Sequence, residues 1–188
     1  MNLFLQLWGG IFYLANKILL AFGEGEGDTR SRKVWGWACY LLGLPAWIVI
    51  LVLERNWIAA ALELGSVPSM LLGLFAAIQN VEQSESTWLS KIAGAFVYLL
   101  IPAGVGYSMY DFGGIVSINQ VLEITAMVGF LGGTYLLAKQ QRRGWLLFML
   151  MNGSVAVLML IQNNLILSIQ QILSLGFVVV GYVRAGRR

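Results

Sequence analysis

Long apolar windows separated by short polar or charged segments run along the whole chain. Crossing about 30 Å of hydrocarbon takes about 20 mostly apolar residues in a helix. Seven windows approach that length, from about Leu3 to Phe22, Val34 to Leu53, Trp57 to Ile78, Ile92 to Tyr110, Gly114 to Ala138, Gly144 to Ile161 and Leu165 to Tyr182. They are continuously apolar, without the alternation of a lumen-lined β-strand. The pattern therefore predicts an all-α integral membrane protein with seven transmembrane helices.

Composition supports a membrane protein and argues against an enzyme. Hydrophobic residues make up 59% of the chain and charged residues 11%, and the mean hydropathy is +0.76. Without histidine, and with Cys39 as the single cysteine, the chain lacks the usual general base and the usual metal ligands. We therefore expect no catalytic activity, no metal and no cofactor. The first window has no basic segment before it, so residues 1–22 are expected to belong to the fold.

Basic residues gather on one side of the predicted topology. That side receives Arg30, Arg32, Lys33, Lys91, Lys139, Arg142, Arg143, Arg184, Arg187 and Arg188. The other side holds only Arg55, and we expect Lys17, near the end of the first window, to snorkel toward the basic side. Cytoplasmic loops carry the excess of Lys and Arg, so we predict a bacterial inner-membrane protein with its amino terminus outside and its carboxyl terminus in the cytoplasm. No basic run belongs to a soluble module, so a nucleic-acid partner is not expected.

The chain matches itself at an offset of 108 residues. This offset aligns Gly36-Trp37 with Gly144-Trp145, Tyr40 with Phe148, Asn56 with Asn164, Glu63 with Gln171, Ser66 with Ser174 and Gly73 with Gly181. The alternative is a coincidence between two apolar segments of similar composition. If the match is a repeat, the second and third windows recur as the sixth and seventh. The first window then pairs with the fifth, with Gln6 roughly opposite Glu123.

The fourth window is left over as a linker. We predict a single membrane domain, residues 1–188, with one three-helix repeat in 1–80, a linker helix in 92–110 and a second repeat in 114–184. Because the linker crosses the membrane once, the two repeats run parallel. Parallel repeats are one of the known transporter plans, with the substrate near mid-membrane at the repeat interface.

Two carboxylates fall inside apolar windows. A charged side chain at mid-span costs about 2.5–3.5 kcal/mol on insertion scales, so it is expected to face a cavity or a partner. Glu63 lies in register with Gln171, which favours a shared central pocket. Glu123 is a candidate for the same pocket or for an interhelical hydrogen bond. A strut between helices stays the alternative for both carboxylates.

Aromatic residues form the second group of site candidates. Trp145, Phe148 and Asn152 are three and four residues apart, so they share one helix face. Trp145 on its own fits an aromatic anchor at the interface, but Asn152 sits deeper, where an amide needs a helix partner or a ligand. In the first repeat Trp37 and Tyr40 take the matching positions. Such faces suit a flat heterocycle, since aromatic side chains hold bases by stacking.

These residues resemble the PnuC-type nicotinamide riboside transporters, which share their fold with the SWEET sugar transporters. The resemblance rests on Lys33-Val34-Trp35-Gly36-Trp37, on Asn56 through Glu63 with Gly73, and on Leu122-Glu123, Trp145, Phe148, Asn152 and Gly181-Tyr182. The family places a W-x-x-W pattern, followed by Asn or Asp four residues on, against its substrate. Trp145 and Asn152 match this pattern, Phe148 replaces the second tryptophan, and Glu63 stands where the family has glutamine.

The resemblance implies a facilitator that carries a small flat vitamin precursor, nicotinamide riboside or a relative of thiamine or riboflavin, which a cytoplasmic kinase then traps. The expected partners are this substrate and the lipid bilayer, and a homo-oligomer stays open. Two alternatives are a SWEET-type sugar carrier and a membrane scaffold that transports nothing.

Overall fold

The computed structural model describes residues 3–24, 29–53, 57–80, 88–163 and 165–187, and these form seven α-helices without a strand. The helices are α1 (Leu3–Phe22), α2 (Thr29–Leu53), α3 (Trp57–Gln79), α4 (Trp88–Phe112), α5 (Ile118–Ala138), α6 (Arg143–Ile161) and α7 (Leu165–Ala185). The all-α prediction is confirmed. The side chains of Gln6 and Trp57 lie outside the described part.

Six helices, α2 to α7, are long and apolar enough to cross a membrane. In α1 the corresponding apolar segment is the shorter Leu7–Phe22. Large apolar side chains also cover the outside of the bundle. On α4, for example, Tyr98 is 74% and Leu99 70% exposed. Exposed apolar area on this scale needs an apolar solvent, so the described residues have the make-up of a multi-pass membrane protein.

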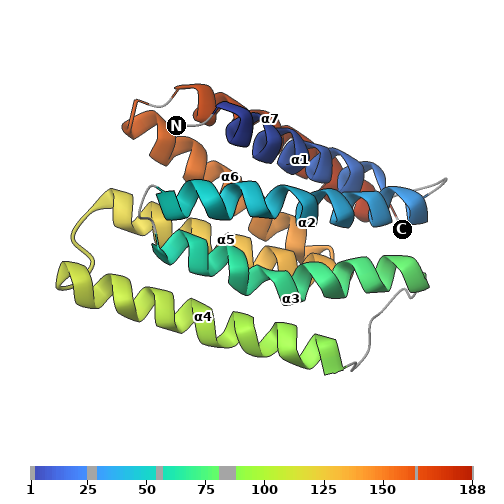
Figure 1. Ribbon diagram of the computed structural model, residues 1–188, viewed down its shortest axis with the longest axis horizontal. Helices are drawn as coiled ribbons and strands as arrows, with labels where there is room; N and C mark the ends of the chain where they lie inside the picture. Colours follow the sequence, from blue (N-terminus) through green and yellow to red (C-terminus); the bar gives the residue numbers. More distant parts are fainter. Residues whose placement is uncertain (1–2, 25–28, 54–56, 81–87, 164, 188) are drawn as a thin grey trace.

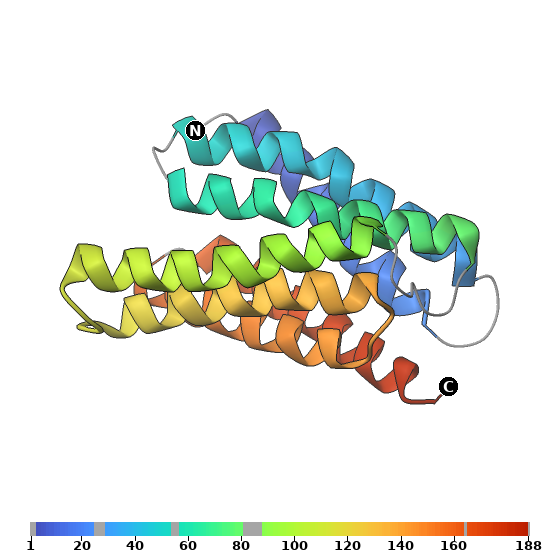
Figure 2. The same cartoon turned by 90° about the horizontal axis from the view of Figure 1, so that it is seen from below.

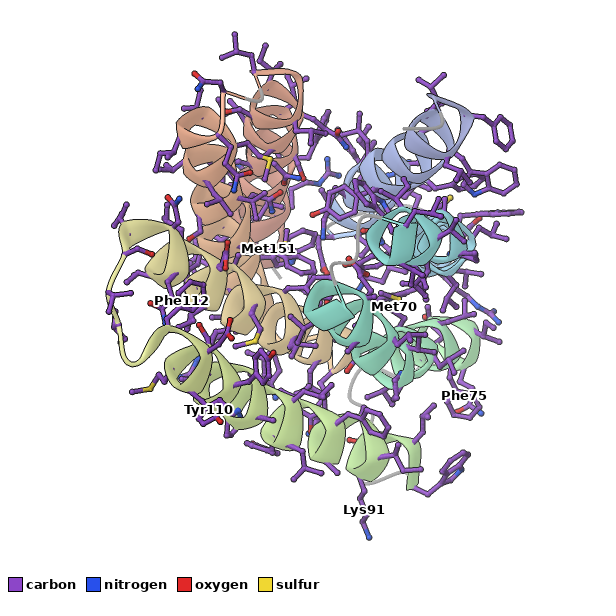
Figure 3. The ribbon with its side chains drawn as sticks, turned by 60° about the vertical axis from the view of Figure 1, so that its left-hand side comes forward. Met70, Phe75, Lys91, Tyr110, Phe112 and Met151 are labelled. Carbon is purple, nitrogen blue, oxygen red and sulfur yellow. The ribbon has the colours of Figure 1, made fainter. Side chains whose placement is uncertain are left out.

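Six helices form a closed ring, and α4 lies outside it. Neighbours around the ring are α1 and α2, α2 and α3, α3 and α5, α5 and α6, α6 and α7, and α7 and α1. The outer helix α4 packs on α3 and α5, and it runs along the lower edge of the molecule in Figure 1 and across the front in Figure 2. Figure 3 shows Met70 of α3 and Met151 of α6 inside the bundle, whereas Lys91 of α4 points away from it.

One end of the bundle collects the basic side chains. Arg30 donates to the carbonyl of Ile78 at the end of α3, and Arg142 donates to the carbonyl of Tyr182 in α7. Arg184 donates to the carbonyl of Glu24 after α1. We call this end, where α1, α3, α5 and α7 finish, the basic end. Figure 1 places the start of α1 and the finish of α7 at opposite ends of the bundle, as an odd number of passes requires.

The fifth helix begins later than the sequence pattern predicts. Gly113 and Gly114 have positive φ angles of 69° and 132°, and the Ser117 hydroxyl caps α5 by accepting a hydrogen bond from the backbone N–H of Gln120. The predicted start at Gly114 is therefore wrong, because an apolar count does not register an N-cap serine. This shift moves every residue of α5 closer to the start of the helix.

Candidate functional site

A pocket opens at the basic end between two tryptophans. Trp37 of α2 and Trp145 of α6 line it together with Leu20 of α1 and Gly73 of α3. Both indoles are almost fully buried, with 3% and 1% of their surface exposed. The remaining lining residues are Glu24, Lys33, Ala77, Leu137, Ala138 and Gln140. We call this space the tryptophan pocket.

Each tryptophan lies against a glycine of a neighbouring helix. A Cβ atom added to Gly73 would collide with the indole of Trp37, and one added to Gly181 would come within 2.7 Å of the indole of Trp145. No larger residue leaves room for either ring. These glycines therefore seat the two indoles that line the pocket.

Polar groups line the opening of the pocket. The Lys33 ammonium lies 3.5 Å from the Glu24 carboxylate and donates to the Gln140 side-chain oxygen at 3.3 Å. The lysine thus joins the end of α1, the start of α2 and the turn between α5 and α6.

A second layer of side chains lies one helical turn below the pocket. Lys17, Tyr40 and Phe148 are each three residues from a pocket-lining residue, namely Leu20, Trp37 and Trp145, and three residues make about one turn. All three side chains are at least 96% buried. The two layers therefore follow each other toward the middle of the bundle.

Lys17 is the basic residue at the centre of this layer. Its Nζ atom lies 3.3 Å from the centroid of the Phe148 ring, 4.9 Å from that of Tyr13 and 5.2 Å from that of Tyr40. No described residue offers it a hydrogen bond. Glu63 of α3 acts electrostatically on Lys17, Tyr13 and Tyr40. We call Tyr13, Lys17, Tyr40, Glu63 and Phe148 the central cluster.

The expectation that Lys17 snorkels toward the basic side is wrong. Its side chain is fully buried and its ammonium lies among aromatic rings of α1, α2 and α6. The number of residues to the end of α1 shows how far Lys17 could reach, but not which way its helix face points. One sequence signal was available, because Tyr13, Asn16 and Lys17 have the three- and four-residue spacing of a common helix face.

Asn152 lies one turn beyond Phe148 on α6 and is fully buried. Its Nδ2 atom donates to the Phe148 carbonyl at 2.7 Å, while its Oδ1 atom has no hydrogen-bond partner among the described residues. The amide thus keeps one acceptor free inside the bundle. The sequence left a helix partner or a ligand open for this amide, and the structure gives its Nδ2 atom a partner on its own helix.

Gln171 occupies the corresponding depth on α7. Its Oε1 atom is buried and unpartnered among the described residues. It lies one turn from Ser174, a fully buried residue near Tyr13. Gln171 thus lies one turn along α7 from a residue that is near Tyr13 of the central cluster.

The structure does not bring Glu123 into the cluster. Glu123 lies five residues after the start of α5, about 7.5 Å along the helix axis, and its side chain is exposed. A carboxylate so close to the helix end reaches the interface without crossing the hydrocarbon core. The prediction that Glu123 shares the pocket rested on the earlier helix start.

The other predicted site residues, Trp37, Tyr40, Trp145, Phe148, Glu63, Asn152 and Gln171, all lie in the two layers or within about two turns of them. Sequence reasoning missed Lys17 and Tyr13. No protein-family model, curated protein or solved structure matches this chain.

Proposed function

We propose that this chain is a membrane transporter whose substrate binds in the tryptophan pocket and the central cluster. One observation carries the proposal. Polar side-chain atoms of Lys17, Trp145, Asn152 and Gln171 are buried without a hydrogen-bond partner among the described residues. Buried polar groups are normally satisfied, and ionisable groups inside membrane bundles mark substrate pathways. A polar substrate that passes through the ring supplies the partners.

The two tryptophan–glycine contacts support a repeat of three helices. Adding 108 to Trp37 and Gly73 gives Trp145 and Gly181, and each pair packs ring against glycine. Leucine or valine can coincide between two apolar helices by composition alone. A specific contact that recurs at the same offset in two different helix pairs therefore favours a repeat over a coincidence of composition.

We call α1–α3 and α5–α7 the two triples. The first helix of each triple also makes a matched contact. Gly36 packs on Leu20 of α1, and Gly144 packs on Leu137 of α5. The two glycines differ by 108 residues and the two leucines by 117, which is also the offset between Gln6 and Glu123. The order of helices around the ring shows the same correspondence. If α1, α2, α3 and α7 are replaced by α5, α6, α7 and α3, the neighbours α1–α2, α2–α3 and α1–α7 become α5–α6, α6–α7 and α5–α3, which are neighbours as well.

Two parallel triples around a central site suit alternating access. In this plan the two bundles rock against each other while the site stays near their interface. The tryptophan pocket opens at the basic end, so the described conformation exposes the site toward the side on which Lys and Arg collect. We propose that this side is the cytoplasm.

The substrate that we propose is a small flat vitamin precursor, nicotinamide riboside or a related compound such as thiamine. Two indoles flank the pocket, and the Trp37 and Tyr40 rings lie 6.4 Å apart at an interplanar angle of 16°. Stacking on an aromatic side chain contributes about 1–3 kcal/mol per base. Together with the resemblance of Trp145 and Asn152 to the nicotinamide riboside transporters, these rings favour a heterocycle over a sugar.

Uptake by the purified full chain in liposomes tests this function. Labelled nicotinamide riboside, thiamine, riboflavin and glucose are supplied in parallel, with empty liposomes as the control. We expect saturable uptake of a vitamin compound, with excess unlabelled compound competing. Uptake of glucose alone would identify a sugar carrier, and no saturable uptake of any compound would leave a scaffold as the function.

Reporter fusions test the proposed orientation. A reporter fused after Arg188 is expected in the cytoplasm, and one inserted at Asn163, in the exposed turn between α6 and α7, is expected outside. A phosphatase reporter and a fluorescent reporter that are active on opposite sides provide the measurement. An external signal from the carboxyl-terminal fusion contradicts the orientation that the basic residues predict.

A further inference from the structure

The rings around Lys17 have the form of a cation-binding cage. Phe148 presents its face to the ammonium at 3.3 Å, and Tyr13 and Tyr40 lie within 5.2 Å of it. The faces of aromatic rings carry negative charge density, and they recognise cations most strongly where water is excluded. These side chains come from α1, α2 and α6, so the cage is formed by tertiary packing and not by one helix.

A carboxylate of α3 lies within electrostatic reach of the cage. Glu63 is the acidic group that acts on Lys17, and it acts on both tyrosines of the cage as well. Aromatic faces together with one half-buried carboxylate within electrostatic reach suit an occupant with a single positive charge. Lys17 is that occupant in the described conformation, although its ammonium donates no hydrogen bond within the described part of the chain.

We propose that the cage is the binding site for a positively charged ring of the substrate, and that Lys17 is a tethered competitor that the substrate must displace. This inference rests on the proposed function and narrows its substrate to flat cations, such as a pyridinium or a thiazolium. Riboflavin and sugars, which are uncharged, fall outside this class.

Geometry explains why the lysine and the substrate exclude each other. The Lys17 ammonium lies against the Phe148 face, 3.3 Å from its centroid, so a ring cannot stack on that face until the ammonium leaves. The single carboxylate of Glu63 can balance one positive charge but not two. Lysine has four flexible methylenes, and the tryptophan pocket lies one turn away along α1 at Leu20. The ammonium can therefore move aside without a change in the helix.

Binding of two matched pyridines tests the proposal on the purified full chain by calorimetry. 1-Methylnicotinamide carries a permanent positive charge, and nicotinamide has the same ring without the charge. In Lys17→Met, which keeps length and removes charge, we expect the Kd of 1-methylnicotinamide to fall at least about tenfold, since a desolvated cation–π contact is of that size or larger. The Kd of nicotinamide is expected to fall by a clearly smaller factor, because the ammonium also covers the Phe148 face for an uncharged ring, whereas only the cation gains the freed charge site. Glu63→Gln should raise the Kd of the cation about tenfold or more.

Lys139→Met is the matched control. Lys139 also lies over a tyrosine ring, 5.5 Å from the centroid of Tyr135, but at the basic end. Its substitution should leave both Kd values unchanged. Size-exclusion chromatography shows whether Lys17→Met is folded. If it is not, Lys17→Thr replaces it, because Thr134 of α5 lies at the position that corresponds to Lys17 at the offset of 117 residues.

Two results would overturn the proposal. One is an unchanged or higher Kd of 1-methylnicotinamide in the lysine variant, which would make Lys17 structural or a ligand for substrate oxygens. The other is an equal gain for both pyridines, which would reflect freed space and not a freed charge site. Failure of the function itself is seen separately, as absence of uptake by the wild-type chain in liposomes.

Discussion

Asn152→Leu is expected to raise the KM of uptake about 5- to 150-fold while the protein still folds. The Oδ1 atom of Asn152 is buried and free of any hydrogen bond within the described structure, and its Nδ2 atom bonds only to its own helix, at the Phe148 carbonyl. Losing a buried hydrogen-bond partner costs about 1–3 kcal/mol, so substrate binding should weaken about 5- to 150-fold. Initial uptake rates in liposomes are measured over substrate concentrations that span the wild-type KM, and they give the KM of the variant.

The fold is expected to tolerate this leucine because Leu44 occupies the corresponding position of α2, where it is 7% exposed. Gln162→Leu is the matched control, since Gln162 is exposed at the far end of the same helix. The control should transport at the wild-type rate. Wild-type uptake by Asn152→Leu would remove this amide from the proposed site.

The helices could be predicted from the sequence because hydrocarbon imposes a length and a composition on each span. The first window, Leu3 to Phe22, coincides with α1, and the ends predicted at Leu53, Ala138 and Ile161 coincide with the ends of α2, α5 and α6. Boundaries that depend on local hydrogen bonds were less accurate. α2 begins at Thr29, five residues before the apolar window, because polar residues at the basic end continue the helix.

The aromatic half of the site could be predicted because its residues follow one another at helical spacing on one helix face. Trp145 and Phe148 have a helical spacing in the sequence, and their ring centroids lie 6.5 Å apart in the structure. The charged half could not be predicted in this way. Placing Lys17 over Phe148 requires the rotation of α1 against α6, which depends on the packing of the whole ring. Hydropathy contains no information about that rotation.

The repeat makes its sharpest prediction at two glycines of α7. Gly181→Ala should destabilise the protein, because the new Cβ would come within 2.7 Å of the buried Trp145 ring, and overpacking typically costs about 1–3 kcal/mol. Gly176→Ala is the matched control on the same helix, since nothing lies within 4 Å of its Cβ position. It should be neutral or stabilising, as alanine favours a helix by about 1 kcal/mol over glycine. Thermal unfolding of the purified variants measures both.

Gly73→Ala extends the test to the first triple. Its Cβ would meet the Trp37 indole as that of Gly181 meets Trp145, so the two variants should lose similar stability if the triples are repeats around one site. Both should also impair uptake, because each displaces an indole that lines the same pocket. A Gly73 variant as stable as the Gly176 control would mean that the two tryptophan–glycine contacts are not equivalent, and the match at 108 residues would then reflect composition alone.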